Sequence, residues 1–186
     1  MSEGKSFNVP TKREQDGKEK LKERMESLGE TVEEKMKKLY PTLHIEAKTI
    51  QESNEQNNIP ESYLFDIWME PLILEQKPTT IVVLDLSEES LQGQVEKTLQ
   101  NWKDHLAKEA MEQLGKKYPG IRIRFNVSKK FPNGAVHFFS VSCPEIIPSD
   151  GIEDNPSDSL AIETLSKEVL LSEVERVLND WQGREG

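Results

Sequence analysis

Residues 81–86 read IVVLDL, and Ser87, Glu88 and Glu89 follow them directly. The apolar run is typical of a buried strand. Ser87 followed by two acidic residues is typical of the start of a helix, because the hydroxyl accepts from exposed amides and acids favour the positive end of the helix dipole. Further along, residues 121–125 read IRIRF and alternate as a half-buried strand does. This stretch predicts strand, helix, strand, and therefore a mixture of α and β structure.

The same periodicities predict the remaining elements. Apolar residues spaced three and four apart predict helices over 18–40, 88–116 and 159–181. Alternation and short apolar runs predict strands at 43–50, within 63–74, and at 81–86, 121–127 and 136–143. The predicted fold is α+β in the order α-β-β-β-α-β-β-α. We expect one mixed, mostly antiparallel five-stranded sheet with helices on one face, including a parallel pair joined by the middle helix.

Composition divides the chain into four predicted segments. Residues 1–16 are polar without periodicity and should form a disordered tail. Residues 17–143 hold the predicted elements of an α+β core domain. Residues 144–158 are acidic and rich in Pro, Ser and Asp, which favours a flexible linker. Residues 159–182 are predicted to form a C-terminal amphipathic helix.

Charge and cysteine content narrow the classes of function. The net charge is −10, which disfavours binding to nucleic acid or anionic lipid by the surface as a whole. No apolar run approaches the ~18 residues that a membrane-spanning helix needs. The N-terminus lacks the apolar segment of a secretory signal, and Cys143 is the single cysteine, so no internal disulfide can form. We therefore expect a cytoplasmic protein.

One local region is basic in spite of the acidic total. No acidic residue lies between Glu112 and Glu145. Within this interval six basic residues form a candidate binding patch: Lys116, Lys117, Arg122, Arg124, Lys129 and Lys130. Two arginines spaced two apart on a strand point to the same face, where they suit a phosphate or a carboxylate. The alternative is that these charges only keep the protein soluble and block edge pairing of strands.

Motifs for catalysis are weak. Glu46-Ala47-Lys48 matches the short acid-x-Lys pattern of metal-dependent nucleases, and Asp66 is the candidate second carboxylate for Mg²⁺. However, the nuclease core places this pattern on its third strand, where the sequence reads Asp85-Leu86-Ser87. The three histidines have no metal-ligand spacing. We expect no catalytic residues, no metal and no cofactor. The sequence therefore favours a protein that is not an enzyme.

The first and last helices are predicted interaction elements. Their apolar positions have the spacing of packing faces: Leu21, Met25, Leu28, Val32, Leu170, Val174 and Trp181. The order of elements is similar to that of small acidic secretion chaperones, a likeness of topology alone. We expect a protein-binding module, such as an adaptor, a small chaperone-like protein or a regulator. Its partner would be another protein or a second copy. The alternative is a nucleic-acid-binding or nuclease-like factor that uses the basic patch.

Overall fold

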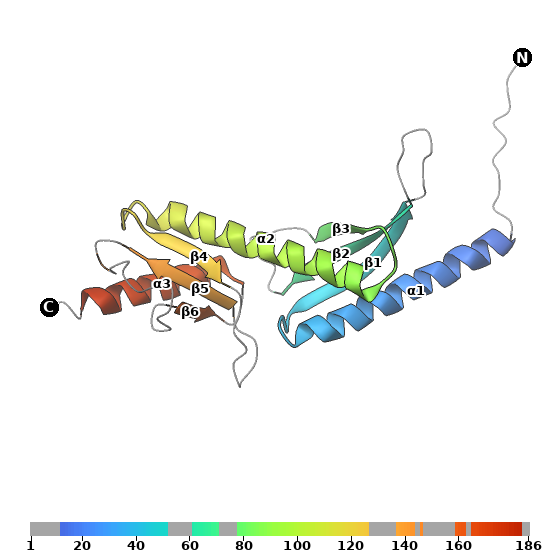
Figure 1. Cartoon of the computed structure of the whole chain (residues 1–186), viewed down its shortest axis with the longest axis horizontal. Helices are drawn as coiled ribbons and strands as arrows, with labels where there is room; N and C mark the ends of the chain where they lie inside the picture. The colour runs from blue at the N-terminus through green and yellow to red at the C-terminus, as the bar shows by residue number, and fades with distance from the viewer. Residues whose placement is uncertain are drawn as a thin grey trace, which may run out of the picture.

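The computed structural model describes residues 12–51, 61–70, 78–126, 137–143, 146, 159–162 and 165–183. It contains two three-stranded antiparallel sheets that lie toward opposite ends of one long helix, α2 (Glu88–Leu114) (Figure 1). The predicted α+β class is confirmed, and the predicted elements occur in the predicted order, with one additional strand before the last helix. No helix within the described residues is long and apolar enough to cross a membrane.

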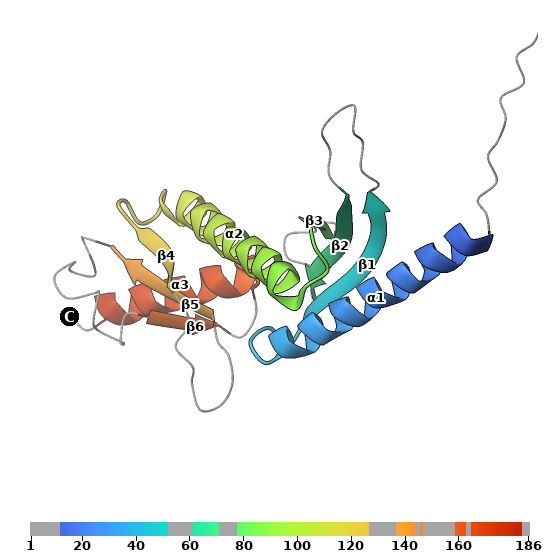
Figure 2. The ribbon, with the colours of Figure 1, turned by 45° about the vertical axis from the view of Figure 1, so that its right-hand side comes forward.

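The first sheet is formed by β1 (Leu43–Gln51), β2 (Ser62–Met69) and β3 (Thr79–Val83) in that order. Helix α1 (Lys12–Lys37) packs along β1, and the first half of α2 packs along β3 (Figure 2). The alternation predicted from the sequence explains this layer, because every second residue of each strand is apolar and turns toward the two helices. The opposite face of the first sheet, which we call the outer face, carries polar side chains such as Asp66 and also the apolar Val82.

The second sheet is formed by β4 (Arg122–Asn126), β5 (His137–Ser142) and β6 (Ser159–Ile162). The second half of α2 packs on β4, and α3 (Lys167–Gln182) packs on β6 (Figure 1). Helix α3 begins after Ser166, whose hydroxyl accepts a hydrogen bond from the amide of Val169. Each sheet therefore has its own terminal helix and shares α2 with the other sheet.

The prediction of a single sheet was wrong. Strands β3 and β4 belong to different sheets, so the parallel pair expected across α2 does not form. The reason is length. The 27 residues of α2 extend about 40 Å, whereas a strand of five residues extends about 17 Å. A helix so much longer than its flanking strands carries β4 beyond the first sheet.

The predicted bounds of the terminal helices also need correction. Residues 159–162, which were expected to be helical, pair with β5 as β6, with Leu160 and Ile162 buried in the core. Their alternation with Ser159 and Ala161 fits a strand, so the last helix starts only after Ser166. Helix α1 starts at Lys12, inside the predicted tail. Residues 1–11 and nearly all of the predicted linker lie outside the described residues.

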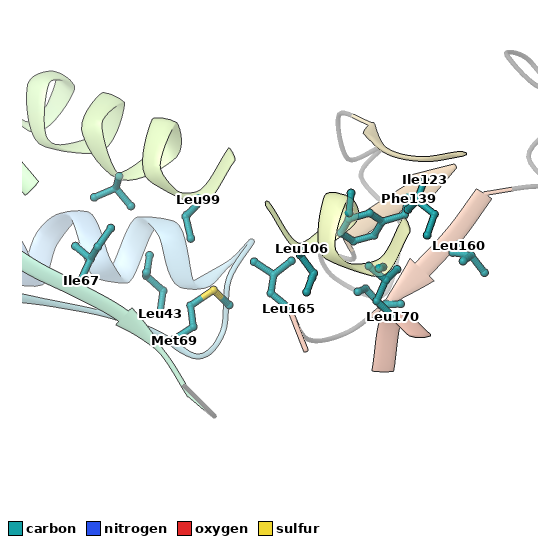
Figure 3. Close-up of a cluster of buried hydrophobic side chains, with 14 of the residues drawn as sticks. Leu43, Ile67, Met69, Leu99, Leu106, Ile123, Phe139, Leu160, Leu165 and Leu170 are labelled. Carbon is teal, nitrogen blue, oxygen red and sulfur yellow. The ribbon is translucent and has the colours of Figure 1, made fainter. Parts of the chain in front are cut away.

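A continuous hydrophobic core follows α2 from one sheet to the other. Leu99 lies over Leu43, Ile67 and Met69 of the first sheet (Figure 3). Leu106 and Leu165 lie between this group and the second sheet, whose core residues include Phe139 (Figure 3). On the apolar side of α2, Lys103 is buried, whereas the neighbouring Trp102 is only partly buried.

Candidate functional site

Two residues of the predicted basic patch lie together on β4. Arg122 and Arg124 are exposed, while Ile123 between them is buried at 1% exposure. Their cross-strand neighbours on β5 are Ser142 and Ser140. Because side chains alternate along a strand, both guanidinium groups project from the face of the second sheet that points away from α2.

The turn that joins α2 to β4 adds two lysines beside these arginines. Lys116 and Lys117 are exposed, and Gly120 completes the turn with a φ of 79°, a left-handed value that favours glycine. Lys117 Nζ donates to Glu175 of α3 at 2.9 Å. Hydrogen bonds with Tyr118 and Glu175 raise the pKa of the Lys117 ammonium. Lys129 and Lys130 lie outside the described residues.

Three cations of this region have no carboxylate partner among the described residues. Lys117 is held by Glu175, but Lys116, Arg122 and Arg124 form no ion pair with any described side chain. We call these three residues the basic face. In a chain with 34 acidic and 24 basic residues, unpaired guanidinium groups are unexpected, because carboxylates are in excess. As far as the described residues go, the basic face is therefore open to an anionic group.

The predicted interaction helices pack against the chain's own sheets. Met25 and Val32 of α1 are buried in the core, and Leu28 packs partly buried against it. Leu21 is partly buried. On α3, Leu170 and Val174 are completely buried, and Trp181 packs partly buried against the core. Most of the side chains predicted to bind a partner are thus buried, wholly or partly, against the chain's own core. Their binding role stays a prediction.

The residues of the nuclease-like pattern do come together on the outer face of the first sheet. Glu46 of β1 lies directly opposite Asp66 of β2, which in turn lies opposite Thr80 of β3. Lys48 Nζ is 2.9 Å from Asp66 Oδ2 and 3.2 Å from Thr80 Oγ1. The hydroxyl of Thr80 also donates to Asp66 Oδ1. Sequence spacing alone did not show this register.

The contacts of Asp66 favour a structural role for this cluster. Partial burial raises the pKa of Asp66, but hydrogen bonds from Thr80 and Lys48 outweigh it and hold the pKa below its usual value. Both carboxylate oxygens are thus engaged by protein donors, whereas a Mg²⁺ ligand needs them free. Among the residues that the structure describes, no group of three or more His, Cys, Asp or Glu side chains is placed to hold a metal ion.

Lys103 is an unusual group that sequence reasoning missed. Its side chain is only 4% exposed at the middle of α2. The ammonium donates to Tyr40 Oη at 2.6 Å and lies 4.0 Å from the centre of the Phe125 ring. Burial lowers its pKa to about 8, against smaller opposing effects of Asp104 and Glu96. One signal was present in the sequence: Lys103 falls four residues after Leu99 and three before Leu106, on the apolar stripe of α2.

The geometry of Lys103 does not suit nucleophilic catalysis. An amine with a lowered pKa is a candidate nucleophile only when a substrate can reach it. Here the aromatic rings of Tyr40 and Phe125 enclose the ammonium. Cys143 is also enclosed, at 1% exposure, with its Sγ 3.8 Å from the carbonyl oxygen of Pro119. Both groups contribute to packing.

No protein-family model and no curated protein matches this chain. Function must therefore be inferred from the chemistry of its surfaces. Among the described residues, the basic face is the group of predicted site residues that is both exposed and without a partner. It can recognise carboxylates or phosphates by charge-assisted hydrogen bonds.

Proposed function

We propose that this protein is a non-enzymatic protein-binding module of the cytoplasm that captures an acidic, extended segment of another protein on its basic face. Such a module would act as an adaptor, a regulator or a small chaperone-like protein. The observation that carries the proposal is that Arg122 and Arg124 are exposed and have no carboxylate partner among the described residues, in a chain of net charge −10. A single, buried, free cysteine suits a reducing compartment.

The spacing of the arginines supports an extended partner. Residues two apart on a strand are separated by about 7 Å on one face. Alternate side chains of an extended peptide have the same repeat, so two acidic residues spaced two apart match Arg122 and Arg124. Each guanidinium can form a bidentate pair with a carboxylate. The exposed Lys116 next to β4 adds a third positive charge.

The small size of the basic face favours protein over nucleic acid as the partner. Proteins that bind nucleic acid through its backbone typically make about 6–10 phosphate contacts. The basic face has three unpaired cations, and the rest of the chain would repel a polyanion. A short acidic segment needs few contacts and carries less charge to repel. The engaged carboxylate of Asp66 likewise supports a non-enzymatic role.

Fluorescence anisotropy with a labelled peptide of four Glu-Ser repeats tests the proposal. We expect the double variant Arg122→Glu/Arg124→Glu to weaken binding at least ~10-fold, because two charge-assisted contacts are replaced by repulsion. The matched control is Lys20→Glu/Lys97→Glu, which makes the same change in net charge at exposed positions on α1 and α2. The control variant should bind the peptide with an affinity within about twofold of that of the wild type.

Two results would overturn this function. One is equal loss of peptide binding in the variant and in the charge-matched control, which would show that only net charge matters. The other is tighter binding of a labelled single-stranded oligonucleotide of the same charge than of the peptide, with loss in Arg122→Glu/Arg124→Glu. That second result would identify a nucleic-acid-binding protein.

A further inference from the structure

The edge of β3 is the least protected sheet edge among the described strands. Strands β1, β3, β4 and β6 each pair on one side only. Folded proteins usually protect such edges with charges, bulges or short length. Strand β1 carries Glu46, Lys48 and a register shift, β4 carries two arginines, and β6 has four residues. Residues 79–84 contain no charged residue and no register shift.

Apolar side chains are exposed along this same edge. Val82 is 46% exposed and Leu84 is 64% exposed, and they are the two exposed large hydrophobic residues in the described part of the chain. The alternate residues Ile81 and Val83 are buried at 5% and 1% under α2. The strand is therefore held firmly from within, while Val82 and Leu84 face solvent along its unpaired edge. A partner strand would meet a rigid template, which limits the entropy cost of binding.

Acidic side chains gather where β3 ends. Asp85 and Glu89 follow the strand and are exposed. Glu61 lies beside this end as well, because Tyr63 pairs with Val83, and the Tyr63 hydroxyl donates to Glu61 at 2.7 Å. One guanidinium lies there too, because Arg24 Nη2 donates to the carbonyl oxygen of Leu86 at 3.4 Å. The C-terminal end of β3 thus has three carboxylates against one guanidinium, and the middle of its edge is neutral and apolar.

We propose that the free edge of β3 binds an extended segment of another protein, in which basic residues precede an alternation of β-branched residues. The segment adds as an antiparallel strand, the pairing that is slightly more stable per residue. Its N-terminal end then lies beside Asp85, where lysine or arginine is attracted. Its outward β-branched side chains cover Val82 and Leu84. This surface lies on the first sheet and is independent of the basic face on the second sheet.

Charge argues against a second copy of this chain as the occupant. A symmetric antiparallel pair of β3 strands would bring together two chains that each carry a net charge of −10. A basic segment offsets the local negative charge, and its charge is opposite in sign to the net charge of the protein.

Anisotropy with two labelled peptides tests this inference. One peptide reads Lys-Lys-Thr-Val-Thr-Val-Thr-Val, and the other carries the same two lysines at its C-terminal end. We expect the first to bind at least ~5-fold more tightly, because its lysines lie beside the acidic end of β3. Val82→Lys should weaken its binding at least ~10-fold, since a charge then lies on the edge and an apolar contact is lost. Two control variants should bind the first peptide with an affinity within about twofold of the wild type. Val82→Thr keeps the edge uncharged, and Gln113→Lys adds the same charge at an exposed site on α2.

Leu84→Lys provides a second variant at the most exposed position, and thermal unfolding of each variant checks that it is folded. Absence of binding by the first peptide, or equal binding by the wild type and Val82→Lys, would overturn the inference. So would self-association in sedimentation experiments that Val82→Lys abolishes, because the edge would then serve a second copy. The Glu-Ser peptide should bind Val82→Lys as it binds the wild type, so this inference and the function of the basic face can fail separately.

Discussion

Lys103 shows how a single side chain can join the two halves of the molecule. Its position on α2 places the ammonium between Tyr40, which precedes the first sheet, and Phe125 of the second sheet. The hydroxyl and the two ring faces replace part of the lost hydration, and no carboxylate of the described residues forms an ion pair with the ammonium. The lowered pKa is the consequence, because burial disfavours the charged amine.

This pKa predicts a pH dependence of stability. The amine has a pKa of about 8 in the folded protein and of 10.5 when unperturbed, so the unfolded chain binds more protons between these values. The free energy of unfolding should therefore rise by about 2 kcal/mol between pH 8 and pH 10. Above pH 10 the partly buried Tyr40, whose pKa is raised mainly by desolvation, acts in the opposite direction.

Urea unfolding at pH 8, 9 and 10 measures this effect in Lys103→Met, which keeps the unbranched stem and removes the titrating group. The rise in the free energy of unfolding with pH should be absent in Lys103→Met. It should be present in the control Lys97→Met, which changes a lysine on the exposed side of α2. An equal rise in both variants would show that Lys103 is not its source.

At the scale of elements, the two long helices each contain an interior glycine that lowers their stability. Neither position is so crowded that only glycine fits. Gly93 of α2 has no atom within 4 Å of the place a Cβ would take. Gly29 of α1 packs near Ile45 and Phe65, yet the nearest atom to its added Cβ is 3.6 Å away, an ordinary contact. Helix α1 runs unbroken through Gly29.

Alanine at either position should raise the free energy of unfolding by about 0.5–1 kcal/mol, because glycine loses more backbone entropy in a helix. Guanidinium unfolding of Gly29→Ala and Gly93→Ala measures the gain. Gly115→Ala provides the contrast, since its Cβ would lie 2.8 Å from the carbonyl oxygen of Met111 and should destabilise the end of α2. A loss of stability in Gly93→Ala would contradict this account.

For the whole molecule, the shared helix and continuous core predict cooperative unfolding. Leu99 serves the first sheet and Leu106 the second, and both belong to one buried cluster (Figure 3). Neither sheet keeps its inner face covered without α2. Loss of one half therefore exposes the core of the other.

Tryptophan fluorescence tests this coupling, because Trp68 reports on the first sheet and Trp181 on α3 of the second half. Variants that keep one of these tryptophans, with the others changed to Phe, should unfold at the same denaturant concentration. Leu99→Ala should lower stability by about 2–5 kcal/mol and shift both signals equally. A shift in the Trp68 signal alone would show that the halves unfold independently.

Local features were predictable from the sequence because they depend on neighbouring residues. The cap at Ser87, the stripe of α2 and the alternation of residues 121–125 each follow from helix or strand geometry. The same alternation placed Arg122 and Arg124 on one face. It did not show that they lack carboxylate partners, since ion pairs join residues that are distant in the chain, as Lys117 and Glu175 are.

The sequence by itself determined the α+β class, the order of the elements it predicted and the acidic total with its basic interval. Only the tertiary structure decided that the strands divide into two sheets, that Glu46 lies opposite Asp66, and that β3 ends a sheet with Val82 exposed. The physical reason is that periodicity records which face of an element is buried. Which strands pair depends on the length of α2 and on contacts between distant segments, and no local pattern encodes these.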